Sequence, residues 1–197
     1  MPIPSRQIGW GTQENLLWQI AKQLEGASCQ ICTTNELIGN LTGATRAYGS
    51  FYSIGNQTGN ASTELTMSLD VSDPWNNGVS LVSGTQITLA KPGVYNLQFS
   101  AQMVKESGNS STHAHIWIAQ NGTDVPYSAS QVSFPSNSVY IVAAWNWFIQ
   151  TTTPDEYVEL KWEINSNVNN GVVIESKAAT GIVPAIPGLI VTVDKVD

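Results

Sequence analysis

Two cysteines and two histidines carry the side chains whose spacing could support metal or redox chemistry. Cys29 and Cys32 have the C-x-x-C spacing of zinc-binding and redox-active pairs, and His113 and His115 alternate along one expected strand. A structural zinc needs four ligands, and a redox pair normally lies at the start of a helix that follows a strand. Neither context is present, so we expect no bound metal and no cofactor. The sequence leaves open whether the cysteine pair is reduced, oxidised or metal-bound.

Paired carboxylates are the second possible source of chemistry. Asp155 and Glu156, or Glu159 and Glu163, could in principle supply the two acids of a glycosidase. Lys161 lies between Glu159 and Glu163 in an alternating segment, which we interpret as a solvated strand face. The sequence contains no nucleophile elbow, no His-Glu-x-x-His helix, no phosphate-binding loop and no dinucleotide-binding glycine pattern. We therefore expect the protein not to be an enzyme.

Three aromatic residues have the character of carbohydrate contacts. Trp75 is followed by two asparagines, and Trp117 and Tyr127 lie on either side of an Asn121-Gly122 pair that predicts a hairpin turn. An aromatic face can stack on a sugar ring while neighbouring amides form hydrogen bonds with its hydroxyls. The plainer interpretation is that these side chains fill ordinary loops.

The charge and hydropathy of the chain exclude several classes of partner. Eight basic and 15 acidic residues give a net charge of −7 at pH 7. Because nucleic-acid affinity comes mainly from Lys and Arg, we expect no nucleic-acid partner. No apolar stretch approaches the roughly 18 residues of a membrane span, and the N-terminus lacks an apolar signal core, so we expect neither membrane insertion nor secretion through a signal peptide. With 42% hydrophobic residues the chain is not intrinsically disordered.

The N-terminal part predicts one short amphipathic helix. We expect it over residues 12–25, capped by Thr12 and ended by Gly26, because its apolar residues recur at helical spacing. A lone helix of about 14 residues is marginal in water, so we interpret residues 1–26 as a docking segment; a helix folded back on the main domain is the alternative. The expected docking residues are Trp10, Leu16, Leu17, Trp18, Ile20 and Leu24. Residues 27–45 predict a linker.

Residues 46–197 predict an all-β domain. Apolar and polar residues alternate there with the period of strands that bury one face. The expected strands are Ala47 to Ile54, Leu65 to Val71, Val79 to Leu89, Tyr95 to Met103, Ala114 to Ile118, Tyr127 to Phe134, Val139 to Ile149, Val158 to Ile164, Val172 to Glu175 and Leu189 to Val196. The strand from Val139 is apolar on both faces and needs cover on both. Such a series of short strands fits an antiparallel sandwich or jelly roll.

The run from Ile87 to Leu97, with its Lys91-Pro92-Gly93 turn and Val94-Tyr95 opening, resembles the hallmark of the complement globular-head and tumour-necrosis-factor jelly-roll superfamily. The order of later features is also similar: the Asn121-Gly122 hairpin, the apolar strand from Val139, the acidic turn at Asp155 and a last apolar strand from Leu189. Ile87 and Leu97 stand where the superfamily usually has Phe. The resemblance spans residues 46–197 and implies an antiparallel, tumour-necrosis-factor-like jelly-roll sandwich.

The same resemblance implies a homotrimer, since members of that superfamily pack one sheet of each subunit around a threefold axis. The chain has aromatic residues beyond what one small sandwich must bury, and these are the expected interface residues: Tyr48, Phe51, Tyr52, Tyr140, Phe148 and Tyr157. A core formed within a single chain is the alternative. Whether an ion lies on the threefold axis is left open.

The run Arg6 to Ile20 is similar to the start of tail and capsid appendage proteins of tailed bacteriophages, where such a segment mounts an exposed β-domain on the particle. This resemblance implies a non-enzymatic virion protein, made in the host cytoplasm, whose partners are itself and other capsid or tail proteins. The alternative function is a receptor-binding or carbohydrate-binding module that contacts host-surface glycans through Trp75, Trp117 or Tyr127.

Overall fold

The computed structural model describes residues 19–25, 46–107, 111–135, 139–165 and 171–196, and the chain divides into two units, Met1–Thr45 and Arg46–Asp197. In the first unit residues 19–25 form a helix. Ile20 and Leu24 are exposed on this helix, and Lys22 forms an ion pair with Glu25 at 3.1 Å. The rest of the expected helix, from Thr12 to Trp18, lies outside the described residues.

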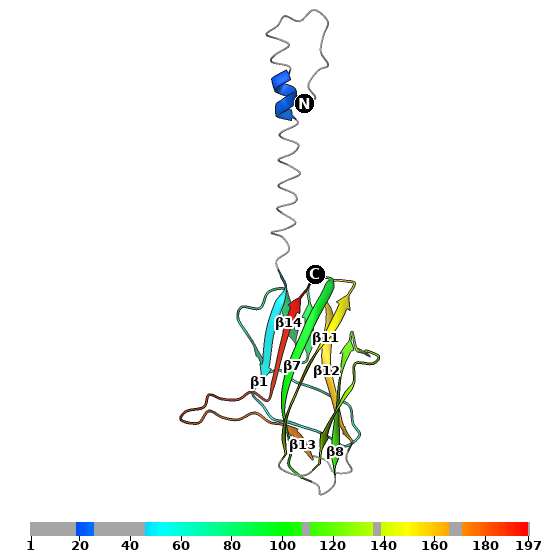
Figure 1. The fold of residues 1–197 in the computed structure, drawn as a ribbon, viewed down its shortest axis with the longest axis vertical. Helices are drawn as coiled ribbons and strands as arrows, with labels where there is room; N and C mark the ends of the chain where they lie inside the picture. Colours follow the sequence, from blue (N-terminus) through cyan, green and yellow to red (C-terminus); the bar gives the residue numbers. More distant parts are fainter. Residues whose placement is uncertain (1–18, 26–45, 108–110, 136–138, 166–170, 197) are drawn as a thin grey trace, which may run out of the picture. The chain divides into compact units, whose positions relative to one another are not determined.

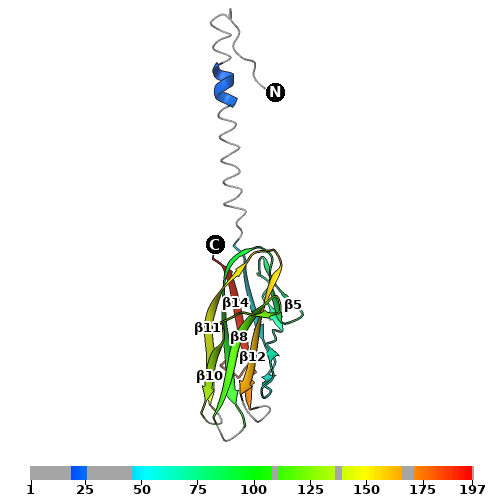
Figure 2. The same ribbon diagram turned by 90° about the vertical axis from the view of Figure 1, so that its right-hand side faces the viewer.

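The second unit is built from two antiparallel sheets (Figures 1 and 2). Sheet A has the strand order β2 (Gln57–Thr58), β13 (Val172–Ile174), β7 (Gly93–Lys105), β14 (Leu189–Lys195), β1 (Tyr48–Ser53) and β4 (Val71–Ser72), with β11 (Tyr140–Thr151) paired to β7. Sheet B has the order β10 (Ser130–Phe134), β8 (Thr112–Gln120), β12 (Glu156–Asn165), β6 (Gln86–Leu89) and β5 (Val79–Val82), with β3 (Leu65–Thr66) on β12 and β9 (Thr123–Asp124) on β8.

The chain repeatedly crosses from one sheet to the other. It passes from β6 in sheet B to β7 in sheet A and back to β8, then from β10 to β11 and back to β12. Strands far apart in sequence therefore become neighbours, as where Tyr48 of β1 pairs with Asp194 of β14. This arrangement of two antiparallel sheets with crossing connections is a jelly-roll sandwich, and it confirms the expected fold class.

The core lies between the two sheets because each long strand alternates buried and exposed residues. In β7, Tyr95, Leu97 and Phe99 point inward, and in β12 Val158, Leu160 and Trp162 do so. These side chains form one continuous cluster of buried apolar residues. Burial of this kind is the main favourable term in folding, at about 25 cal/mol per Å² of apolar surface.

Two expected strands are not continuous strands. The segment Leu65 to Val71 is not one strand: only its ends pair, as β3 and β4, although Met67 and Leu69 are buried as the alternation predicts. The segment Val79 to Leu89 is a hairpin, because Ser83 and Gly84 both adopt positive φ, at 54° and 74°, between β5 and β6. The apolar alternation continues without a break from Leu65 to Val71, so it does not reveal the first interruption, whereas from Val79 to Leu89 it lapses at Ser83 and Thr85.

The Asn121-Gly122 hairpin is confirmed. Both residues have positive φ, 50° and 77°, and they connect β8 to β9, with Gln120 paired to Thr123. Two consecutive positive φ values define the type I′ turn that the Asn-Gly pair favours. By contrast, the strand expected from Tyr127 starts at Ser130, because Tyr127 itself has a positive φ of 62° and belongs to the preceding turn.

Candidate functional site

The outward-facing side chains of sheet A form the candidate functional site, which we call the outer face. Alternation along β1, β14, β7 and β11 turns every second side chain away from the core. The outer face consists of Tyr48, Ser50 and Tyr52 of β1, Ile190, Thr192 and Asp194 of β14, Asn96, Gln98, Ser100 and Gln102 of β7, and Tyr140, Val142, Ala144, Asn146 and Phe148 of β11.

The outer face is polar along its middle strand and apolar at both edges. The β7 row carries amides and a hydroxyl, and Asn146 Nδ2 donates to Asn96 Oδ1 at 2.8 Å. On the β11 edge, Val142 is 56% exposed and Phe148 is 68% exposed. On the other edge Tyr52 and Ile190, which are paired in register, are partly exposed. Apolar side chains of this size are more typical of an interface than of a solvated surface.

Strand β11 is an edge strand in the part of the chain that the structure describes. Its residues from Tyr140 to Thr151 pair with β7 from Val104 to Gly93, and no described strand pairs with its other edge. A long edge strand with unpaired backbone groups and apolar side chains invites contact with another chain.

The charged groups on this side of the domain are paired. The guanidinium of Arg46 binds the Asp194 carboxylate, with Nε donating to Oδ1 at 2.7 Å, and this hydrogen bond raises the pKa of Arg46. Lys177 Nζ lies 3.2 Å from Glu175 Oε2, a contact that raises the pKa of Lys177. Because each cation has its own anion, the outer face presents little net charge.

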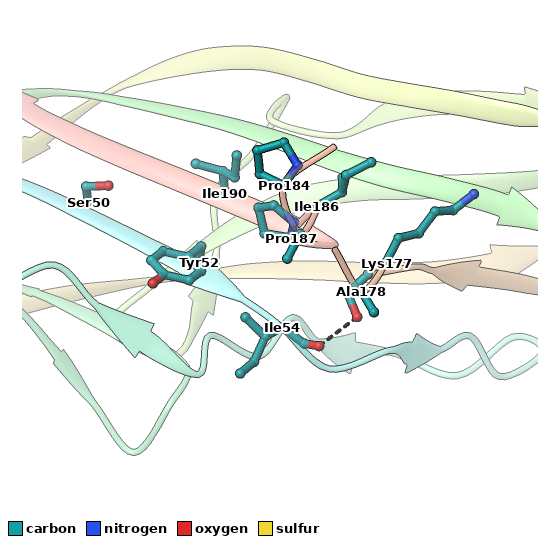
Figure 3. A pocket seen from close by; sticks show the side chains of 11 residues that line it. Ser50, Tyr52, Ile54, Lys177, Ala178, Pro184, Ile186, Pro187 and Ile190 are labelled. Carbon is teal, nitrogen blue, oxygen red and sulfur yellow. Dashed lines mark hydrogen bonds between the residues drawn. The ribbon is translucent and has the colours of Figure 1, made fainter. Parts of the chain in front are cut away.

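An apolar groove of about 950 Å³ lies at the β1 and β14 edge of the outer face (Figure 3). Its floor is formed by Tyr52 and Ile54 with Ile190 of β14. Its far wall comes from the connection between β13 and β14; we call residues 176–187 of that connection the arm. Ser176 Oγ fastens the root of the arm by donating to the Ile54 carbonyl at 2.6 Å.

The expected interface residues do not all lie on one face. Tyr48, Tyr52, Tyr140 and Phe148 belong to the outer face, as defined by their strand register. Phe51 must be removed from the set, because it is 0% exposed and packs in the core of its own chain. Adjacent residues of a strand point to opposite faces, so Phe51 and Tyr52 cannot share one. Tyr157 is also elsewhere, half-buried on β12 of sheet B.

The arm and the groove that Ile190 lines were not predicted from the sequence. Residues 178–187 carry no charged side chain but include Ile182, Val183 and Ile186, and three glycine or proline residues interrupt the segment. That composition was a usable signal, since an uncharged apolar stretch between two strands must either be buried or meet a partner.

The three possible glycan contacts lie on different elements. Trp75 is 62% exposed in the connection from β4 to β5, which is held to β1 by the Asn76 side chain bonded to the Ser50 amide at 2.8 Å. Trp117 is half-buried on β8, and its indole donates to Asp124 at 2.7 Å. Tyr127 is fully exposed after β9. Trp117 is thus fixed by its own hairpin, whereas Trp75 and Tyr127 present open aromatic surface.

Glu156 and Glu159, two of the carboxylates that could have supplied catalytic acids, have structural partners. Glu156 is buried and accepts hydrogen bonds from the amides of Thr152 and Thr153, at 2.7 and 2.8 Å, which lower its pKa to about 2. Glu159 and Lys161 form an ion pair at 3.3 Å and are largely covered. The expectation of a solvated face around them is wrong at Glu159, because Thr85 of the β5–β6 turn lies against its carboxylate.

The histidines also have partners within the sheet. His113 Nδ1 lies 3.0 Å from Ser133 Oγ, and His115 Nδ1 lies 3.1 Å from Glu163 Oε1. Cys29 and Cys32 lie outside the described residues. Within residues 19–25 and the described parts of 46–196, no group of three or more His, Cys, Asp or Glu side chains could hold a metal ion. The described helix is too short to cross a membrane.

Of the expected docking residues, Ile20 and Leu24 are exposed on the short helix. Trp10, Leu16, Leu17 and Trp18 lie outside the described residues.

Comparison with solved structures gives similarity in fold. The chain is similar to Eiger TNF from S. frugiperda with a TM-score of 0.49 and 9% identity, over 77% of this chain and 93% of that one. It is similar to murine APRIL with a TM-score of 0.48 and 10% identity, over 77% of this chain and 100% of that one. No protein-family model matches the sequence, and no curated protein matches it.

Proposed function

We propose that this chain is a non-enzymatic virion appendage of a tailed phage. In this proposal residues 46–197 form the head of a homotrimer through the outer face of sheet A, and the N-terminal segment mounts that head on the capsid or tail. The single observation that carries the proposal is the outer face itself, which exposes apolar side chains at both of its edges and ends in the unpaired strand β11.

Charge favours a second copy as the occupant of this face. The chain carries a net charge of −7, so two copies repel one another wherever acidic surfaces meet. The outer face avoids this repulsion, because its middle strand is uncharged and the nearby Asp194 is neutralised by Arg46. A closed ring of identical copies then buries one edge of the sheet against the next.

The mounting role rests on the N-terminal segment. Ile20 and Leu24 are exposed on a short helix in the unit Met1–Thr45. Such a helix gains stability mainly by laying its apolar side on another surface. The similarity of residues 6–20 to phage appendage proteins supplies the class of that surface.

A second function has its own supporting observation. Trp75 and Tyr127 expose aromatic rings on loops of the β domain, where stacking on a sugar is possible. A head that both assembles and contacts host-surface glycans is compatible with these positions. A glycan-array signal that Trp75→Ala or Tyr127→Ala abolishes would establish this role, and an array without signal would remove it.

The first test is the solution mass of the full chain, measured by light scattering after size exclusion. We expect about three times 21.2 kDa. A monomer at micromolar concentration would overturn the trimeric head.

The second test removes residues 1–25. The shortened chain should keep its oligomeric state and its far-ultraviolet circular dichroism spectrum, but it should no longer join particles in a complementation assay. Incorporation at the wild-type level would overturn the mounting role.

A further inference from the structure

The arm is an unusual feature of the β domain. It leaves β13 after Glu175 and returns to β14 at Gly188, and it projects from the domain as an extended ribbon (Figure 1). Backbone hydrogen bonds of 2.8 Å join Lys177 and Ile186 in both directions, and the Thr180 amide donates to the Val183 carbonyl at 2.9 Å. The arm is thus closed at its root by one β-bridge and near its tip by a turn.

The tip of the arm is apolar and uncovered. Ile182 is 97% exposed, and Val183 beside it is about half exposed. The stretch from Ala178 to Val193 contains no charged residue. A β-branched side chain that is almost fully exposed at the tip of such a loop buries almost no apolar surface within its own chain, so only another surface could cover it.

Strand register identifies which part of a second copy can reach the groove at the root of the arm. Tyr52, Ile190 and Ser100 form one row across the sheet, and Ala144 of β11 completes it. The next row contains Gly188, Gln102 and Val142, since the Gln102 amide donates to the Gly188 carbonyl at 2.7 Å. Rotation about an axis parallel to the strands keeps each row at its own height. In a ring built on such an axis, the groove of one copy meets Val142 and Ala144 of the next.

The two surfaces are complementary in chemistry and shape. The groove is concave and lined by Tyr52, Ile186 and Ile190, whereas Val142 stands out from the edge strand and is 56% exposed. Neither surface carries an unpaired charge, because Lys177 at the rim is bound to Glu175.

We propose that the arm is a clamp between copies: the groove at its root takes Val142 of a neighbouring copy, and Ile182 and Val183 close over the β11 edge of that copy. This inference rests on the proposed self-association and adds the segment that holds the copies together. It makes the contact heterologous, with groove and arm on one copy and edge strand on the other.

Cross-linking of two single-cysteine chains tests this contact directly. Both chains carry Cys29→Ser and Cys32→Ser; one also carries Val142→Cys and the other Ile186→Cys. After co-expression and treatment with a short bismaleimide, we expect a cross-linked pair of chains at several times the yield of a matched mixture in which Val82→Cys replaces Val142→Cys. Val82 is an exposed valine on β5 of sheet B, outside the outer face. Equal yields from the two mixtures would overturn the clamp.

Charge substitutions give the second readout. Val142→Asp and Ile186→Asp should each raise the dissociation constant of the assembly at least about tenfold, as expected for a central contact, while Val82→Asp leaves it unchanged. Circular dichroism confirms that each variant is folded. If the wild-type chain is a trimer and all three variants keep its mass, the clamp is wrong but the trimeric head stands. If the wild-type chain is a monomer, both proposals fail.

Discussion

The ammonium group of Lys177 lies 4.3 Å from the centre of the Tyr140 ring, so that a residue of the arm is held against a residue of β11. Lys177 is bound to Glu175 at the same time. The two contacts fix the direction in which the arm leaves sheet A. They also hold Lys177 of the arm next to β11 of its own copy. Tyr140 belongs to the outer face, through which we expect copies to associate.

Lys177→Gln should loosen the arm. It removes the ion pair and the cation–π contact, whereas Lys177→Arg keeps a cation over the ring. We expect amide hydrogen exchange at Lys177 and Ile186 to become several-fold faster in the Gln variant and to change little in the Arg variant. The Lys22→Gln variant, which alters the separate helix, serves as control. Because the ion pair raises the pKa of Lys177 above 10.5, this contribution persists at neutral pH and is lost only in strongly alkaline solution.

Glu156 should make the stability of the domain depend on acid pH. Its carboxylate joins the amides of Thr152 and Thr153 to the side chains of Gln120 and Asn121, at 2.7 and 2.9 Å. The folded-state pKa, about 2, is below the ordinary value of 4.5. The stabilisation is therefore complete above pH 4.5 and is lost as the pH falls toward 2.

We expect Glu156→Gln to lower the free energy of unfolding by about 2 kcal/mol at pH 7, the size of lost hydrogen bonds to a charged group. Urea titrations at several pH values should show the variant and the wild type converging near pH 2. A difference that stays constant over this range would contradict the role of the carboxylate charge. Glu64→Gln, at an exposed glutamate, is the control.

Phe51 and Phe148 should behave in opposite ways. Phe51→Ala opens a cavity in the core and should cost about 3–5 kcal/mol of stability. Phe148→Ala removes a side chain that is 68% exposed, so it should leave the unfolding of the isolated chain almost unchanged while weakening self-association. Thermal unfolding and light scattering measure the two effects. Equal losses of stability in the two variants would show that Phe148 is part of the core.

Asp70 should secure the turn that follows β1. Its carboxylate accepts hydrogen bonds from Ser53 Oγ at 2.8 Å and from the amides of Ile54 and Gly55 at 2.9 and 3.1 Å. The bond from Ser53 is the main cause of its lowered pKa, so the contribution is present above about pH 4 and is lost in stronger acid. We expect Asp70→Asn to lower the Tm by a few degrees at pH 7 and by less at pH 3. Ser53→Ala should reproduce part of the loss.

The fold was largely readable from the sequence because strand alternation is a local property. The alternation in Tyr95–Met103 and Val158–Ile164 corresponds to β7 and β12, and the Asn121-Gly122 pair marked its turn correctly. The turn at Ser83-Gly84 was missed although the alternation of apolar residues lapses between Leu81 and Ile87 and a Ser-Gly pair is itself a turn signal.

The sequence by itself determined an all-β chain in which each strand has one row of apolar side chains. This could be read locally because successive side chains of a strand point to opposite faces, so the pattern depends only on neighbouring residues. Only the tertiary structure decided which of these rows are buried in the core of the chain's own domain. Phe51 is covered because its face of sheet A looks toward sheet B, and Tyr52 remains partly exposed because its face does not. The partner of β1 is β14, more than a hundred residues later, so no local pattern could assign these faces. The arm and its groove depend on the same long-range pairing, and they exist only once β13 and β14 have joined β7.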